Sequence, residues 1–504
     1  MGPKKQNLLE HLRRHHIPLT AECGGHGRCG KCRVLFPAAS APSPSAKDRE
    51  VFDQKQLEEG WRLACCHSLS GDLTIFLPSL DGEKEAGIVK TSAFLERECA
   101  GRFPGQETGA EPGIVNKELI ALDLGTTSLA GARLSADREL RTAAAINHQR
   151  IFGADVISRI QAANEGHLKE LQTIVRQDID QLVRQLGSEP GRVPMVVSAN
   201  TTMGHLLQGY SCMELGRKPY RPVDISLHWT GSCLMLPGIS AFLGADVVSG
   251  IVASGMDQSS GISLLVDLGT NGEMVLGSRD RMLAASTAAG PAFEGGNISQ
   301  GMPGIAGAVS EVDLVHDRLI YKTIGGRQPV GICGTGVLEA VWALRQLGLV
   351  DETGLLAEEY RREGFYVAGR VRLTQKDIRE LQLAKAAVRA GIDILLRRYG
   401  IGPDQVDQVF LAGGFGQKLN PHKAEAIGLL PAGMAAKTRP VGNTSLAGAL
   451  LAARVLSENG CSLQEGGKMP LILDRFRQAA ALVEEVPLAE EEDFQDRYIF
   501  HMGL

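Results

Sequence analysis

The stretch KELIALDLGTTSLAGARL, residues 117–134, places an apolar run, a short polar turn and a second apolar run in direct succession. This order is typical of two antiparallel strands joined by a tight hairpin. The turn carries Asp123, Gly125, Thr126, Thr127 and Ser128. A glycine turn with hydroxyls and backbone amides suits phosphate oxygens, and a carboxylate at a strand end suits a magnesium ion and its waters. A tight Gly-Thr hairpin without a ligand would show the same residues, so this stretch alone leaves both interpretations open.

The same design returns in ISLLVDLGTNGEMVLG, residues 262–277. A strand again leads to an aspartate, Asp267, and a polar turn follows before the next strand. The turn residues are Gly269, Thr270, Asn271 and Gly272. Because Asp123 and Asp267 hold the same place in both copies, the sequence predicts an internal structural duplication.

Two such hairpins facing each other resemble the organisation of the actin, sugar-kinase and Hsp70 ATPase superfamily. That resemblance assigns residues 244–255 and 443–453 to the two helices that connect the lobes, where small side chains let helices cross closely. It also assigns VFLAGGFGQKLNP, residues 409–421, to a strand and a glycine turn that contact the adenosine. The adenosine contacts would be Gly413, Gly414 and Phe415.

The resemblance implies an α/β, duplicated actin-like (ribonuclease H-like) ATPase domain that binds ATP and Mg²⁺. We expect lobe I to span residues 117–243, and lobe II with the C-terminal tail to span residues 244–504. Asp123 and Asp267 would organise the magnesium ion and the attacking water. The phosphates would be held by Gly125, Thr126, Thr127 and Ser128 and by Gly269, Thr270, Asn271 and Gly272.

Two titratable residues outside the hairpins have open roles. His205 lies on an expected helix after Asn200, and a hydrogen-bonded structural histidine is the favoured interpretation over a functional one. Glu294 lies in the glycine-rich loop of residues 286–302. It would either position water or a magnesium ion, or remain a solvated loop carboxylate.

A second motif lies near the N-terminus, in CGGHGRCGKC, residues 23–32. Cys23, Cys29 and Cys32 follow a C-x5-C-x2-C spacing, and Cys65 comes later in RLACC. Thiolates are soft ligands for iron or zinc, and the glycines let backbone amides approach a buried anionic centre. The spacing is close to the plant-type [2Fe–2S] pattern of C-x4-C-x2-C plus a distant cysteine.

Three other interpretations of this loop are weaker. A zinc ribbon needs two C-x2-C pairs, and only one is present. Gly25, Gly27 and Gly30 spell G-x-G-x-x-G, and the loop nearly spells a Walker A motif. However, Cys32 occupies the Ser/Thr position that would bind magnesium, and no long apolar strand precedes the loop.

The loop therefore resembles the cluster loop of [2Fe–2S] ferredoxin domains, which implies Cys23, Cys29, Cys32 and Cys65 as ligands. Cys65 is preferred to Cys66 only because RLAC resembles the fourth-ligand strand of ferredoxins; spacing does not decide between them. We expect a small α+β domain in residues 1–79 and a linker in residues 80–116. Such domains usually begin with a β-hairpin, so either the sheet is smaller here or the start is incomplete.

Composition limits the remaining possibilities. The chain has 504 residues, 43% of them apolar, and a net charge of −5, which does not favour nucleic acid as a partner. No apolar run approaches the roughly 20 residues that span a bilayer, so no membrane partner is expected. The N-terminus lacks the apolar core of an export signal. Ten cysteines in a chain without such a signal predict a reducing, cytoplasmic location.

A ferredoxin-like unit joined to an actin-like ATPase is a rare pairing. Together with GADVISRI (153–160), ANTTM (199–203), STAAGPAFEGG (286–296) and DFQDRYI (493–499), it resembles the reductive activators of corrinoid proteins. The resemblance implies ATP-dependent, one-electron reduction of the cob(II)amide form of a corrinoid protein to cob(I)amide. It implies a corrinoid protein and an upstream low-potential electron donor as partners. The oligomeric state stays open, a homodimer included.

Two alternatives come from other classes of protein. One is an ATP-dependent electron donor to another low-potential metalloenzyme. The other is a small-molecule kinase of the sugar-kinase class with a regulatory cluster. A kinase would consume ATP in proportion to a phosphorylated product, whereas an activator would show slow ATP hydrolysis that its partner stimulates.

Overall fold

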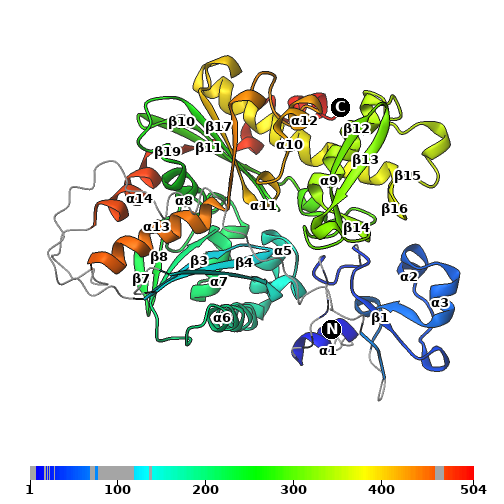
Figure 1. Ribbon diagram of the computed structural model, residues 1–504. Coiled ribbons are helices and arrows are strands. Elements are labelled where there is room, and N and C mark those ends of the chain that lie inside the picture. The colour runs from blue at the N-terminus through cyan, green and yellow to red at the C-terminus, as the bar shows by residue number, and fades with distance from the viewer. Residues whose placement is uncertain are drawn as a thin grey trace.

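The computed structural model describes residues 7–77 except positions 16, 18, 20, 22, 28 and 69–73, and residues 118–135, 139–459 and 470–504. The expected linker of residues 80–116 lies outside them. No helix in this part of the chain is both long and apolar enough to cross a membrane. Figure 1 shows two large sheets, one above the other, with a small N-terminal unit beside the lower one.

The N-terminal unit, called the cluster domain below, is α+β. Its helices pack on a two-stranded antiparallel sheet, and Leu35 pairs further with Phe76. The buried Asp48 of α2 links this helix to the segment around β2, because it accepts hydrogen bonds from the Leu63 amide at 2.8 Å and the His67 ring at 2.7 Å. The elements are α1 (Leu8–Arg14), β1 (Arg33–Leu35), α2 (Ala46–Val51), α3 (Gln54–Glu59) and β2 (Trp61–Leu63).

Lobe I is a six-stranded sheet in the order β5-β4-β3-β6-β8-β7, with α5, α6 and α7 packed around it. β3 is antiparallel to β4 and parallel to β6, so the first hairpin emerges beside a parallel neighbour. The strands are β3 (Leu119–Leu124), β4 (Ser128–Leu134), β5 (Leu140–Ile146), β6 (Met195–Ala199), β7 (His228–Thr230) and β8 (Cys233–Met235). The helices are α5 (Val156–Ala162), α6 (Leu168–Gln185) and α7 (Thr201–Gln208).

Lobe II repeats five strands of this topology in a sheet with the order β18-β17-β9-β10-β11-β19, and its sixth strand, β19, joins the opposite edge from β7. β9 is antiparallel to β10 and parallel to β17, as β3 is to β4 and β6. The predicted duplication is therefore confirmed by strand order and direction. The elements are β9 (Ser263–Leu268), β10 (Gly272–Ser278), β11 (Arg281–Thr287), α10 (Gln375–Tyr399), β17 (Gln408–Ala412), α11 (Gly413–Gly416), α12 (Pro421–Ala426), β18 (Thr438–Gly442), α14 (Leu471–Leu482) and β19 (Val483–Glu485).

An inserted unit separates β11 from α10. It lies above the cluster domain in Figure 1 and consists of a three-stranded sheet, a two-stranded hairpin and α9. Its elements are β12 (Ala308–Val315), β13 (Arg318–Thr323), β14 (Gly331–Ile332), α9 (Gly334–Gln346), β15 (Phe365–Ala368) and β16 (Val371–Leu373).

Two helices cross between the lobes, as the resemblance implied. They are α8 (Ala245–Ser254) and α13 (Thr444–Asn459). A Cβ atom added at Gly448 would lie 2.5 Å from the Ser249 Cβ, so the crossing requires glycine at this point. This close approach brings the start of α13 to the end of β3.

The C-terminal segment folds back on α10 and ends with α15 (Phe494–Phe500). Gln382 donates to the Met502 carbonyl at 2.5 Å, and His501 bonds Asp393 at 2.7 Å. Phe494 packs on the core of lobe II, whereas Ile499 and Phe500 are exposed.

Candidate functional site

The tips of the two hairpins meet at Glu294. The hydroxyls of Thr127 and Thr270 both donate to Glu294 Oε2, at 3.1 and 2.9 Å, and their oxygens lie 3.0 Å apart. Burial raises the pKa of Glu294, and the two hydroxyl donors oppose that shift. Glu294 is therefore a bridge between the lobes and not a solvated loop carboxylate.

Carboxylates crowd below the second hairpin. In the strand register Glu273 lies opposite Asp267, and Asp246 begins α8 close by. Burial, followed by the charges of Asp246, Asp123 and Glu294, raises the pKa of Asp267 to about 7. Burial raises the pKa of Asp246 to about 7, with Asp123 as the charge that adds to it, and burial also raises the pKa of Glu273. Mg²⁺ prefers oxygen ligands such as these carboxylates and usually keeps several of its waters.

Asp123, at the end of β3, is held by donors from lobe II. Asn443 Nδ2 donates to one carboxylate oxygen at 2.7 Å, and Ser445 Oγ donates to the other at 2.6 Å. Burial raises the pKa of Asp123, and these two bonds oppose the shift. The carboxylate thus ties β3 to the first turn of α13.

The first hairpin rests on a buried cation. Arg159 is fully buried and donates from Nη2 to the Thr126 carbonyl at 2.6 Å and from Nε to the Gly153 carbonyl at 3.0 Å. Asn200 donates to Thr126 Oγ1 at 3.0 Å, and Asn147 donates to the Gly125 carbonyl at 2.9 Å. Burial lowers the pKa of Arg159 to about 9. The hairpin therefore presents its backbone from a positively charged support, which favours an anion.

The remaining turn residues take different positions. Thr127 and Ser128 are exposed at the tip of the first hairpin, whereas Thr126 is buried. In the second hairpin Gly272 is buried, and Gly269 and Asn271 are half-buried. A Cβ at Gly272 would lie 2.8 Å from the Val388 side chain, so this position requires glycine.

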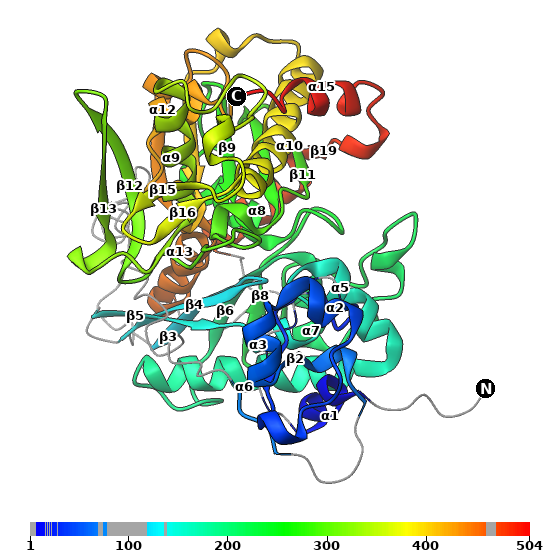
Figure 2. The same cartoon turned by 90° about the vertical axis from the view of Figure 1, so that its right-hand side faces the viewer.

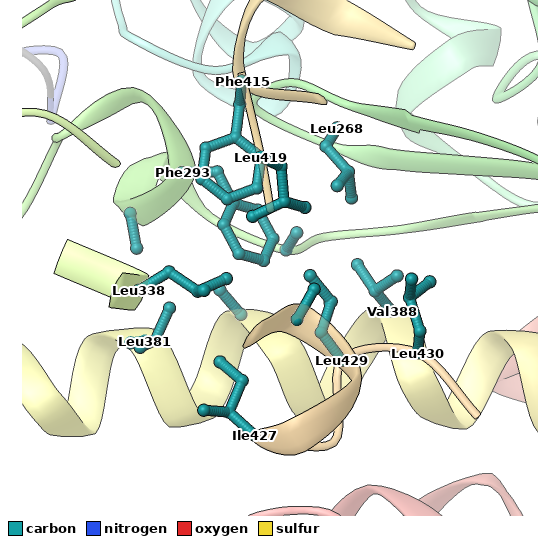
Figure 3. Packing of buried hydrophobic residues seen from close by; sticks show 14 of the residues in the cluster. Leu268, Phe293, Leu338, Leu381, Val388, Phe415, Leu419, Ile427, Leu429 and Leu430 are labelled. Carbon is teal, nitrogen blue, oxygen red and sulfur yellow. The ribbon is translucent and has the colours of Figure 1, made fainter. Parts of the chain in front are cut away.

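The expected adenosine loop forms the start of α11, and its three residues face different ways. Gly413 has φ +82°, and a Cβ there would lie 2.7 Å from Asp267 Oδ1. A Cβ at Gly414 would meet nothing within 4 Å, so this backbone faces open space. The Phe415 side chain instead packs on Phe293, with ring centroids 4.7 Å apart, in the core drawn in Figure 3. The ring of Phe415 is therefore turned into the core and its backbone faces the loop, so contact of this residue with an adenosine stays a prediction.

The four cysteines expected to bind a cluster converge as two pairs. The Sγ atoms of Cys32 and Cys65 lie 3.3 Å apart, and Cys29 forms a side-chain hydrogen bond with Cys23. Among the described residues no three His, Cys, Asp or Glu side chains gather tightly enough for a single metal ion. A two-iron cluster takes its four thiolates over two irons, so two pairs fit it better than they fit a single zinc ion. Cys66 lies 3.7 Å from Cys65, so the choice of fourth ligand remains a prediction.

The guanidinium of Arg13, beside these thiols, indicates that an anionic group binds there. The Nε and Nη2 atoms of Arg13 are buried, and no described residue accepts a hydrogen bond from them. A Cβ atom added at Gly25 would lie 3.8 Å from Arg13 Nη1 and 3.9 Å from the Cys65 Cβ, so the guanidinium borders the cysteine loop. Glu10 and the thiols of Cys32, Cys23 and Cys65 are the groups that interact with its charge. The sulfur atoms of an iron–sulfur cluster would supply acceptors, so the donor set and its surroundings fit a [2Fe–2S] cluster.

His205 is structural, as the favoured interpretation had it. The side chain is 1% exposed; Nδ1 donates to the Thr201 carbonyl at 2.8 Å, and Nε2 accepts from the Val223 amide at 2.9 Å. Burial lowers its pKa, which keeps the ring neutral.

Sequence reasoning missed Asp246, Glu273, Asn443, Ser445 and Arg159. Glu273 carried a signal, because it interrupts an otherwise apolar strand directly after the second hairpin. Asn443 and Ser445 lay inside a segment recognised only as a connecting helix. Nothing local in the sequence marked Arg159 as the support of a hairpin more than thirty positions away.

Three family models match the chain. Residues 1–70 match the 2Fe-2S iron-sulfur cluster binding domain, residues 119–259 match the RACo middle region, and residues 261–504 match the C-terminal domain of RACo, the ASKHA domain.

Curated proteins and a solved structure agree with these models. The corrinoid activation enzyme RamQ of Eubacterium limosum is 31% identical over 377 residues, which are 66% of this chain and 63% of that protein. The [Co(II) methylated amine-specific corrinoid protein] reductase of Methanosarcina barkeri is 32% identical over 234 residues, 42% of each chain. The chain thus spans less than two thirds of the length of both relatives. A solved reductive activator for corrinoid, iron-sulfur protein matches with a TM-score of 0.69 and 25% identity, covering 100% of this chain and 96% of that one.

Proposed function

The chain belongs to the family of reductive activators of corrinoid proteins, and on that premise we propose that it reduces the cob(II)amide form of a corrinoid protein to cob(I)amide at the expense of ATP. One electron enters from a low-potential donor and leaves to the cobalt of the partner. The proposal also places the protein in a reducing cytoplasm, in line with the absence of a disulfide bond among the described cysteines.

The observation that carries this proposal is the presence of two sites of different chemistry in one body. Two pairs of thiols lie in the cluster domain, and two hairpins meet over a group of carboxylates between the lobes. A [2Fe–2S] cluster, when bound, supplies one-electron transfer. A nucleotide site between two lobes supplies a closure that can change the affinity for a partner.

The residues of the nucleotide site divide the work. The first hairpin, supported by Arg159, would hold phosphate oxygens through its backbone amides and the Thr127 and Ser128 hydroxyls. Asp267 would hold Mg²⁺ through the waters of the ion, with phosphate oxygens as further ligands, and would accept a proton from the attacking water. Asp246 and Glu273 lie beside it and keep the surroundings of that carboxylate acidic. Asp123 would keep α13 aligned on β3 through Asn443 and Ser445. The Gly413–Gly414 backbone would lie against the adenosine.

The test mixes the purified chain with a low-potential donor, ATP and a corrinoid protein loaded with cob(II)amide. The visible spectrum should convert to that of cob(I)amide only when ATP and the cluster are both present. Conversion that proceeds equally without ATP would contradict the proposal. Phosphorylation of a small hydroxyl compound in proportion to ATP use would support the kinase alternative instead.

A variant isolates the cluster from the nucleotide site. Cys29→Ser should bleach the [2Fe–2S] absorbance and abolish cob(I)amide formation while leaving ATP binding intact, because Cys29 lies in the cluster domain. Cys333→Ser is a matched control, since the Cys333 thiol is buried beside Thr335 in the inserted unit, far along the chain from the loop. A retained spectrum in Cys29→Ser would exclude this residue as a ligand.

A further inference from the structure

The cluster domain contacts lobe I at an aromatic residue. Phe152, in the segment between β5 and α5, is 4% exposed. A Cβ added at Gly24 of the cysteine loop would lie 3.1 Å from the Phe152 carbonyl oxygen, so the loop backbone abuts this residue. The Arg13 guanidinium carbon lies 5.1 Å from the centroid of the Phe152 ring. Both Figure 1 and Figure 2 place the cluster domain beside α5 of lobe I.

Arg13 therefore lies between the cluster cysteines and lobe I. One face of its guanidinium stacks on an aromatic ring, an arrangement that holds a cation in position. Two of its nitrogen atoms, Nε and Nη2, are buried without a hydrogen-bond acceptor among the described residues. A buried charged donor without an acceptor is more costly than a neutral one, so an acceptor group beside the cysteines would stabilise Arg13 in this position.

We propose that Arg13 raises the reduction potential of the [2Fe–2S] cluster and that Phe152 of lobe I holds Arg13 in that position. The inference rests on the part of the proposed function that places a cluster at the four cysteines. The cluster gains one unit of negative charge when it accepts an electron. A nearby cation and N–H donors to sulfur stabilise that reduced form, and both effects raise the potential.

The consequence is a difference between docked and undocked cluster domains. While the domain rests on Phe152, the cluster accepts an electron from its donor more readily. When the domain leaves lobe I, Arg13 loses the aromatic ring and gains water, so the reduced cluster becomes a stronger reductant. Gly153 directly follows Phe152, and its carbonyl accepts a hydrogen bond from Arg159 Nε. Arg159 Nη2 donates to the Thr126 carbonyl of the first hairpin. The Arg159 side chain therefore links the segment that contacts the cluster domain to the hairpin expected to bind phosphate.

The test is a redox titration of the full-length chain with its cluster, monitored by the electron paramagnetic resonance signal of the reduced form. At the midpoint potential of the wild-type cluster, Arg13→Gln should lower the ratio of reduced to oxidised cluster about tenfold. This ratio corresponds to a midpoint potential about 59 mV lower for a one-electron couple. Arg13→Lys keeps the charge and should shift the ratio less. Arg14→Gln removes the same charge from the adjacent, exposed position of α1 and should leave the ratio unchanged.

A variant on the other side of the contact tests the role of docking. Phe152→Leu should shift the ratio in the same direction as Arg13→Gln but by a smaller factor, because it leaves the cysteine loop intact. Phe242→Leu, which removes an exposed ring of lobe I packed on Tyr220, should have no effect. If Arg13→Gln fails to hold a cluster, Phe152→Leu still decides the question.

The inference is overturned if Arg13→Gln and Arg14→Gln give the same potential, if Arg13→Lys shifts it as far as Arg13→Gln, or if Phe152→Leu leaves it unchanged. The titration needs neither ATP nor a corrinoid protein. A potential shift in a chain that never forms cob(I)amide would therefore reject only the proposed function. Normal cob(I)amide formation with no potential shift would reject only this inference.

Discussion

The two hairpins share strand order, strand direction and the position of an aspartate, yet their surroundings carry opposite charge. The first hairpin rests on the buried guanidinium of Arg159, and its Asp123 accepts two hydrogen bonds from lobe II. The second hairpin rests on Glu273 and Asp246, and no described residue donates a hydrogen bond to the Asp267 carboxylate. The duplicated backbone therefore supports two roles, an anion site on one side and a cation site on the other.

The difference between the aspartates gives the largest expected effect. Asp267→Asn should lower the rate of ATP hydrolysis about 100- to 1,000-fold, because it removes the carboxylate that is free to bind Mg²⁺ and accept a proton. Asp123→Asn should lower the rate only about tenfold, through misalignment of α13. Phosphate release at saturating ATP measures both. Equal losses in the two variants would mean that the hairpins are functionally equivalent after all.

The cation below the first hairpin should matter mainly for binding. Arg159→Lys keeps a charge but cannot donate to the Thr126 and Gly153 carbonyls at the same time. The KM for ATP should therefore rise about tenfold, which corresponds to about 1.4 kcal/mol of binding free energy. Arg133→Lys serves as the control, because its ion pair with Glu118 lies at the far end of β4. A loss of kcat without a change in KM would place Arg159 in the chemical step instead.

The carboxylates below the second hairpin predict a pH dependence without nucleotide or Mg²⁺. The pKa of Asp267 rises from the ordinary 3.8 to about 7 on folding, so the folded state binds more protons than the unfolded state between these values. Stability should therefore fall as the pH rises from about 4 to 7. The thermal midpoint should drop by about a few degrees between pH 5 and 8 and drop less in Asp267→Asn. Added Mg²⁺ and ATP should restore stability most at pH 8, since metal binds the deprotonated carboxylates.

The contact between the hairpin tips should give the smallest effect. Thr127→Ala and Thr270→Ala each remove one donor to Glu294, and each should raise the KM for ATP a few-fold. The double variant should differ from the sum of the single effects by about 0.5–1 kcal/mol, because the residues share one partner. Strict additivity would show that the tips act independently.

The duplication, the cysteine loop and the crossing helices were readable from sequence because each is a local pattern of few residues. Apolar runs ending in D-L-G-T predicted both hairpins, and the small residues around Gly448 predicted the close crossing. The charge difference between the hairpins was not readable. Asn443 lies 320 positions from Asp123, and only the packing of α13 on β3 brings the two together.

Phe415 shows the opposite kind of limit. The glycine turn around it is typical of a nucleotide loop, but an aromatic side chain in a short helix takes whichever face is buried. In the structure that face is the core of lobe II, against Phe293 and Leu419 (Figure 3). The sequence also did not predict a role for Arg13, because it is one of several basic residues in an amphipathic helix.

The unsatisfied guanidinium of Arg13 has a consequence for the life of the protein in the cell. A newly made chain that has not received its iron must either bury this charge with no acceptor from the described part of the chain or leave the cluster domain loosely attached to lobe I. Iron loading removes that conflict and favours the attached form. We therefore expect chains made under iron limitation to be cut first around the N-terminal domain, so that proteolysis would remove immature copies before they compete for the partner.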